Sequence, residues 1–102
     1  MANSLVVMKD GSDVQGKIQD KTFSFKTDAL GEISNSTDQI EEINIAKFSG
    51  DSPDQMILTN QTQYRGQLLS STVTIALSPD NQVKSIQTTF IKTIMVHYDI
   101  DD

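Results

Sequence analysis

The chain contains a single histidine, His97, which is its first candidate for acid–base chemistry. A general acid or base needs a positioned partner and a pocket, and the nearest acids lie within residues 99–102, at the end of the sequence. His97 stands between Val96 and Tyr98, so in a strand its side chain points away from the face that these two residues share. We therefore expect His97 to face solvent and to take no part in catalysis.

Other catalytic and metal-binding arrangements lack the residues that they need. The absence of Cys removes thiolate catalysis and Cys-based zinc or iron–sulfur sites, and one His cannot build a multi-histidine centre. There is no Gly-x-Ser-x-Gly elbow, no phosphate-binding glycine loop and no EF-hand spacing. The acidic pairs Asp10/Asp13 and Asp51/Asp54 fit turn formation and solubility better than ion binding. We expect a chain that is not an enzyme and that holds no cofactor and no metal.

The charge balance argues against nucleic acid as a partner, because eight basic residues stand against fourteen acidic ones and give a net charge of −6. The only arginine, Arg65, follows Tyr64, and both residue types are enriched among the anchors of protein interfaces. A buried tyrosine beside a surface arginine would explain the pair equally well. Tyr64 and Arg65 are therefore our candidate interface residues.

The elements that must position these residues come in two similar sets, which appear when residues 5–48 are laid over residues 55–98. Gly16 then falls on Gly66, and apolar positions and turns coincide. We infer that one supersecondary unit is used twice, as a first β repeat over 1–50 and a second over 51–102, packed as one unit. The matched apolar pairs include Val7/Ile57, Ile18/Leu68, Phe23/Val73, Phe25/Ile75 and Ile33/Val83, followed after one inserted residue by Ile40/Ile91 and Ile43/Ile94.

Within each repeat the apolar residues alternate with polar ones, which is typical of half-buried strands. Leu5–Met8 predicts a first strand, and Asp10-Gly11 predicts a type I′ turn in which both central residues have positive φ. The second strand holds Gly16, and a glycine inside a strand marks a sharp bend or the close approach of another backbone.

The third strand follows from the alternation around Phe23 and Phe25, and Gly31 and residues 79–81 predict the turns after the third strand of each repeat. Ser36–Gln39 has the spacing of a capping box, so a short helical turn is expected before the closing strand that Ile40 begins.

This order of elements resembles that of the SH3-like and Sm-like small barrels. It is also similar to tandem β-modules of uncharacterised bacterial proteins, a pattern that Thr27, Gly31 and Ile40-Glu-Glu-Ile43 fit. The resemblance implies a fold, because the shared residues form strands and turns. The RNA-binding residues of Sm-like proteins do not carry over, because the only Arg-Gly, Arg65-Gly66, lies within a strand and not in the loop where that family places it.

We therefore expect an all-β fold from an internal duplication, built as two tandem five-stranded SH3-like small barrels or as one β-sandwich with pseudo-twofold symmetry. The expected function is a non-enzymatic module that binds a protein partner or other copies of itself. The alternative is a small barrel that binds a ligand or nucleic acid. No basic leader and no long apolar run are present, so we expect no membrane association and a cytoplasmic location, although an exported chain without its signal would read the same.

Overall fold

The computed structural model describes residues 3–46 and 53–98, which contain ten β-strands and two short 3₁₀ turns. This confirms the all-β prediction, and within these two segments no helix is long and apolar enough to span a membrane. The first half comprises β1 (Asn3–Met8), β2 (Asp13–Ile18), β3 (Thr22–Thr27), β4 (Gly31–Ser36), η1 (Thr37–Gln39) and β5 (Ile40–Asn44). The second half comprises β6 (Asp54–Leu58), β7 (Gln63–Leu68), β8 (Thr72–Leu77), β9 (Gln82–Gln87), η3 (Thr88–Phe90) and β10 (Ile91–Tyr98).

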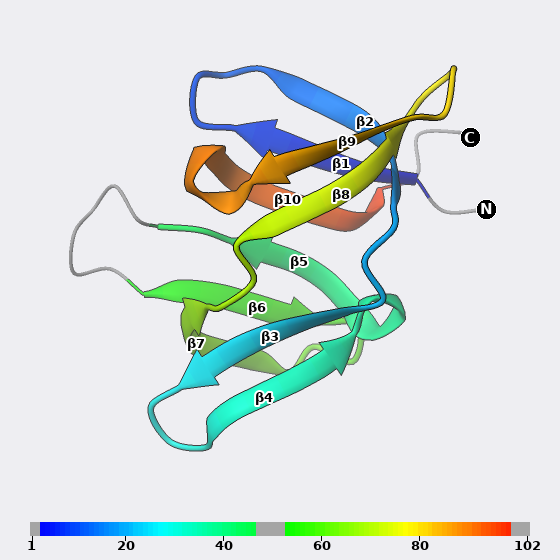
Figure 1. Ribbon diagram of the computed structural model, residues 1–102. Coiled ribbons are helices and arrows are strands. Elements are labelled where there is room, and N and C mark those ends of the chain that lie inside the picture. The colour runs from blue at the N-terminus through cyan, green and yellow to red at the C-terminus, as the bar shows by residue number, and fades with distance from the viewer. Residues whose placement is uncertain (1–2, 47–52, 99–102) are drawn as a thin grey trace.

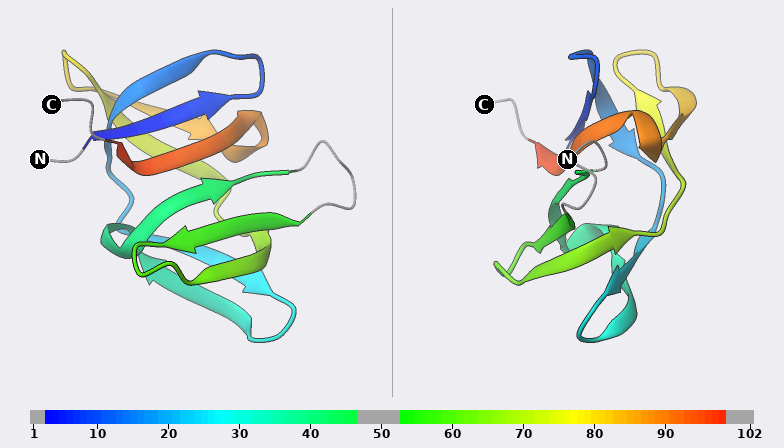
Figure 2. Two further views of the ribbon diagram at one scale, coloured as in Figure 1. Left: turned by 180° about the vertical axis from the view of Figure 1, so that it is seen from behind. Right: turned by 90° about the vertical axis from the view of Figure 1, so that its left-hand side faces the viewer.

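These strands form one continuous antiparallel sheet with the order β4-β3-β7-β6-β5-β10-β1-β2-β8-β9. This order has an internal symmetry. If each strand is replaced by the strand five places from it in the chain, for example β4 by β9 and β3 by β8, the result is the same order read from the other end. The midpoint is the β5–β10 pair, in which Ile43 lies opposite Ile94. The sheet curls, so that β3 and β8 lie on one side of the molecule (Figure 1) and β1, β10, β5 and β6 lie on the other (Figure 2).

The two halves exchange strands. β2 pairs with β1 and with β8, and β3 pairs with β4 and with β7, so β2 and β3 are not neighbours although they follow one another in the chain. Gly16 lies opposite Leu77, and Gly66 lies opposite Thr27. We call two residues counterparts when the registers place them at the same position in the two halves; Gly16 and Gly66 are the first example.

The three-residue links between β2 and β3 and between β7 and β8 do not form hairpin turns. A short hairpin loop needs a residue with positive φ, and no residue of 19–21 or 69–71 has one. Each link instead bonds the other half. The backbone amide of Gln19 donates to Thr74 at 2.8 Å, and the amide of Thr74 donates to the Asp20 carboxylate at 2.7 Å. The counterpart bonds join Leu69 and Ser70 to Ser24.

The hairpin turns that lie wholly within the described segments do hold positive φ, at one position each. In the β1–β2 turn Gly11 has φ +94° and its amide donates to Met8, while Asp10 stays at negative φ. This is a three-residue loop with a bulge at Gly11, so the type I′ prediction is wrong. Gln61 takes the same place in the β6–β7 turn. Gly31 and Asn81, predicted at left-handed positions, have φ +73° and +59°.

The predicted short helical turn is present as η1, but Ser36 makes no side-chain cap hydrogen bond, so the capping box does not form. The first residue of the turn is fixed in another way. The hydroxyl of Thr37 donates to the carbonyl of Asp20 at 2.6 Å, and its counterpart Thr88 donates to the carbonyl of Ser70 at 3.0 Å. Each 3₁₀ turn is thus attached to the link that leads into the exchanged strand.

Gly16 and Gly66 lie where the exchanged strands approach most closely. A Cβ on Gly16 would lie 2.9 Å from the carbonyl carbon of Ala76 and closer still to its oxygen. A Cβ on Gly66 would meet the carbonyl of Lys26 in the same way. Both contacts are with backbone, which cannot rotate aside. Of the two explanations that the sequence left open for these glycines, a sharp bend or the close approach of another backbone, the contacts support the second.

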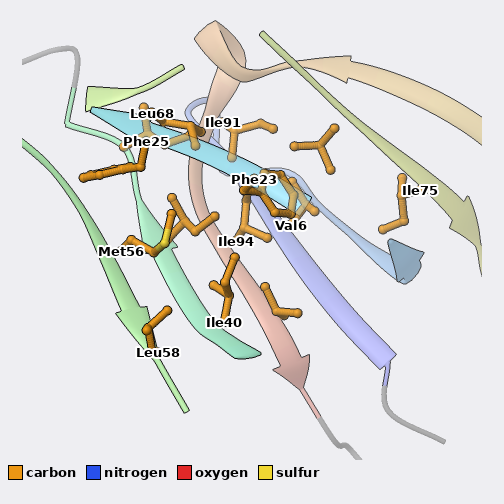
Figure 3. Close-up of a cluster of buried hydrophobic side chains, with 14 residues drawn as sticks. Val6, Phe23, Phe25, Ile40, Met56, Leu58, Leu68, Ile75, Ile91 and Ile94 are labelled. Atoms are coloured by element: carbon orange, nitrogen blue, oxygen red, sulfur yellow. The ribbon is translucent and has the colours of Figure 1, made fainter. Parts of the chain in front are cut away.

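A single apolar core lies between the two sides of the curled sheet. Figure 3 shows its labelled side chains gathered in one group, including Val6 from β1, Phe23 from β3, Ile75 from β8 and Ile94 from β10. All four are fully buried. Because the two halves contribute to this one cluster, neither half keeps its apolar face covered without the other.

The residue inserted in the second half lies in the β8–β9 turn and not after Val83 as predicted. Residues 78–81 join Leu77 to Gln82, whereas three residues join Thr27 to Gly31. The strand alternation is therefore shifted by one, and Val83 corresponds to Glu32 and is exposed. By the same shift Asn35 is the counterpart of Ile86, and the side-chain oxygen of Asn35 is buried with no hydrogen-bond partner.

The glycine contacts predict a clear order of stability. Gly16→Ala and Gly66→Ala should each lower the free energy of unfolding by about 3 kcal/mol, because a methyl group must displace the backbone of the exchanged strand. Gly31→Ala is the control, because a Cβ at this position would meet no other atom and the substitution is unfavourable only through the positive φ of Gly31. It should lower the free energy of unfolding by about 1 kcal/mol. Urea unfolding measures all three, and equal losses would contradict the close approach.

The shifted alternation predicts a stabilising substitution. Asn35→Ile should raise the free energy of unfolding by about 1 kcal/mol, because it removes an unpaired buried oxygen and copies Ile86, which packs against the core. Ser34→Ile places the same residue on the exposed face of the same strand and should give no comparable gain. A loss of stability in Asn35→Ile would show that the oxygen has a partner in solution.

Candidate functional site

The internal symmetry separates residues that the fold requires from residues that it does not. At some positions that serve packing, both halves carry the same residue, as at Gly16 and Gly66. Where an exposed, chemically distinct group in one half has an ordinary polar residue as its counterpart on the same backbone, that backbone forms without the distinct group. Such departures are therefore the places at which to look for a functional site.

The first departure is a polar hollow of about 350 Å³ around His97, bounded by β2, η1 and β10. The His97 ring donates from Nε2 to the backbone carbonyl of Asp38 at 3.1 Å, and Lys17 and Gln19 line the same hollow. His97 is half-buried, which differs from the solvent-facing position that we expected. Its ring partner is a main-chain carbonyl, and this hydrogen bond fixes the orientation of the ring in the hollow.

The counterparts of these residues carry none of the charges. His97 corresponds to Ala46, Asp38 to Thr89, Lys17 to Gln67 and Gln19 to Leu69, and the related hollow of about 300 Å³ is lined by Leu69 and Thr89 among others. The charged groups of the polar hollow are therefore not needed for the fold.

The second departure is an apolar hollow of about 550 Å³ where the β1–β2 turn meets η3. Its lining residues are Met8, Lys9, Asp10, Thr89 and Phe90. The amide of Lys9 donates to the carbonyl of Phe90 at 2.9 Å, which holds the two turns side by side, as Figure 1 shows at the end of the β1–β2 hairpin. The Phe90 side chain is 58% exposed. We call these five residues the Phe90 hollow.

The counterpart of the Phe90 hollow has the same backbone and different side chains. The amide of Thr59 donates to the carbonyl of Gln39 at 2.9 Å, the same bond at the same length. Gln39 thus stands where the second half has Phe90, and Leu58, the counterpart of Met8, is buried. At this position the first half therefore has a glutamine and the second half an exposed aromatic ring, with the same main-chain hydrogen bond in both.

The electrostatics of the Phe90 hollow come from Lys9 and Asp10, which are adjacent and opposite in charge. The backbone amide of Ser12 donates to the Asp10 carboxylate at 2.8 Å. Hydrogen bonds from the Ser12 amide and hydroxyl hold the pKa of Asp10 below its ordinary value, so this carboxylate is ionised at neutral pH. The apolar centre is thus bordered by one positive and one negative group.

The free edges of the sheet are a third feature, and one of them is protected. β9 carries Lys84 opposite Ile75, whose side chain is buried, so Lys84 stands in the core-facing row of an edge strand. A further strand at this edge would cover its ammonium group, which is a common device against strand addition. Its counterpart in β4, Ile33, packs against the core. The β9 edge therefore offers a weaker case for an interface than the Phe90 hollow.

The candidate interface residues of the sequence separate onto two faces. Tyr64 is half-buried and packs against the core, whereas Arg65 is exposed and lies opposite Gln55. The structure therefore gives them no shared contact. Sequence reasoning did not identify Phe90 as a candidate, because the preceding Thr88 and Thr89 indicate a polar turn. Only the fold shows that its ring is exposed.

The acidic pairs have different roles. Asp54, expected at the surface, is buried and accepts hydrogen bonds from the amides of Ala46 at 2.9 Å and Leu68 at 3.0 Å. Its role is to satisfy two backbone donors, which corrects the prediction of a solubilising residue. Asp51 and residues 99–102 lie outside the described residues. Within the described segments, no group of three or more His, Asp or Glu side chains could hold a metal ion.

Comparisons with known proteins add no relative to this picture. No protein-family model, no curated protein and no solved structure matches the chain.

Proposed function

We propose that the chain is a non-enzymatic interaction module that binds a protein partner or further copies of itself. The observation that carries the proposal is the Phe90 side chain, 58% exposed beside the half-buried Met8 in an apolar hollow. Aromatic residues at the centre of a small apolar patch are the usual anchors of protein interfaces. The polar counterpart Gln39 supports the proposal, because it indicates that the fold does not need an apolar residue at this position.

We also propose that the fold arose by internal duplication. The symmetric strand order and the matching registers at Gly16 and Gly66 support an internal duplication of a five-stranded unit. If β8, β9 and β10 are taken with β1 and β2, the strand order and the 3₁₀ turn before the last strand resemble an SH3-like small barrel. In this proposal each barrel is completed by strands of the other repeat. Such barrels serve many functions, so the function rests on the hollow and not on the fold.

The alternative is a barrel that binds a small ligand, and the polar hollow favours it. Lys17, Asp38 and His97 are charged or titratable groups that the counterpart positions lack. Nucleic acid is the weaker form of this alternative, because the chain carries a net charge of −6 and Asp38 brings a negative charge into the hollow itself.

The test is the mass of the full chain in solution. Sedimentation and light scattering from micromolar to millimolar concentration should show a mass that rises above the 11.3 kDa monomer, or a protein partner that binds saturably and is displaced by free chain. A chain that stays monomeric throughout and binds no protein contradicts the proposal. Retention of single-stranded RNA with a steep dependence on salt would instead establish the nucleic-acid alternative.

A further inference from the structure

We propose that the Phe90 hollow is the contact surface of a twofold-symmetric homodimer, in which the ring of each copy enters the hollow of the other. This inference rests on the proposed function and names its partner: a second copy of this chain. Its evidence is the shape of the patch, the order of its charges and its occurrence in only one half.

The shape of the patch suits a contact with itself. A twofold interface uses the same surface on both copies, so this surface must hold both a projecting group and a space to receive one. The Phe90 ring is 58% exposed, and the hollow of about 550 Å³ beside Met8 and Thr89 is open. Two such surfaces facing each other would remove both rings from water.

The charges of the patch are also self-complementary. Lys9 and Asp10 are adjacent at the border of the hollow. When a twofold axis brings two hollows together in opposite directions, Lys9 of each copy can face Asp10 of the other. Two opposite-charge contacts then surround an apolar centre, an arrangement that selects partner and orientation.

The single occurrence of the patch sets the size of the assembly. The counterpart surface presents Gln39, Thr59 and Asn60 in place of Phe90, Lys9 and Asp10, with neither an exposed ring nor a pair of opposite charges. Of these two counterpart surfaces in the described part of the chain, only the Phe90 hollow is self-complementary. Association through it closes at two copies and does not extend into a polymer.

The size of the patch sets the strength of the dimer. Five residues surround the Phe90 hollow, which is far fewer than the 20–30 residues or so that each side of a standard interface contributes. We therefore expect weak association, with dissociation in the micromolar to millimolar range.

The first experiment replaces Phe90 with the residue that its counterpart uses. Phe90→Gln should weaken dimerisation roughly tenfold or more, measured by sedimentation of the full chain over a concentration series. Val83→Gln is the matched control, because Val83 is also 58% exposed and lies on the edge strand away from the hollow. It should leave the dimer unchanged. Thermal unfolding checks that both variants fold. We expect Phe90→Gln to fold, because the first half already has a glutamine, Gln39, at the corresponding position.

The second experiment reverses one charge. Lys9→Glu should weaken the dimer roughly tenfold at low salt. In the variant, two negative groups of each copy, at positions 9 and 10, face the two negative groups of the other. High salt screens this repulsion and should reduce the loss. Lys84→Glu changes the net charge by the same amount on the β9 edge and is the control. Equal effects of the two variants would show net repulsion and overturn the specific contact.

The outcomes separate this inference from the proposed function. A dimer that survives Phe90→Gln overturns the Phe90 hollow as the interface, while self-association and the proposed function stand. Species larger than a dimer overturn the single self-complementary surface. A chain that stays monomeric to millimolar concentration overturns the homodimer, and the proposed function then depends on a different protein partner.

Discussion

The close approach of two backbones at Gly16 and at Gly66 is the constraint on which the rest of the structure depends. At each point a strand of one half lies so near a strand of the other that no side chain fits between them. These contacts join β2 to β8 and β7 to β3, and they bring Phe23 and Ile75 across to cover the inner strands. The short links at 19–21 and 69–71, which contain no residue at positive φ, leave the chain no local way to turn back. The single core follows from this exchange, because each half supplies part of the covering layer of the other.

The near-symmetry of the framework makes its departures informative. Asp54 and Ser4 are counterparts and differ in chemistry, yet both are buried and bond the main chain, so their difference concerns structure. Phe90 and Gln39 have different side chains, but the backbone carbonyl of each accepts the same hydrogen bond, from the amide of Lys9 or of Thr59. A buried position that changes must be compensated by its neighbours, whereas an exposed one need not be. The exposed departures are therefore where the chain is free to carry a function, and a phenyl ring in contact with water is unfavourable to leave uncovered.

The candidate site could not be found from the sequence, and the reason is physical. Tyr64 and Arg65 were selected by residue type, but adjacent residues in a strand point to opposite faces, so one packs on the core and the other faces water. Phe90 follows two threonines in a segment whose local sequence indicates a polar turn. Its exposure depends on how η3 meets the β1–β2 turn, and these elements are far apart in the chain. The half-burial of His97 against Asp38 depends in the same way on a contact between the two halves.

Local pattern by itself determined the strands, the glycines inside them and the left-handed positions at Gly31 and Asn81, because alternation and φ preferences act over a few residues. It also placed the closing strands and the short turn before Ile40, but not the matching turn before Ile91. The tertiary structure decided which distant strands pair, because the links at 19–21 and 69–71 do not form local hairpins and nothing within them specifies β8 as the partner of β2 or β7 as the partner of β3. It decided the position of the inserted residue as well, since one extra residue in the β8–β9 turn exchanges the faces of the strand that follows. Both decisions rest on interactions between distant segments, whose free energy depends on the packing of the whole core and not on the residues of any one strand.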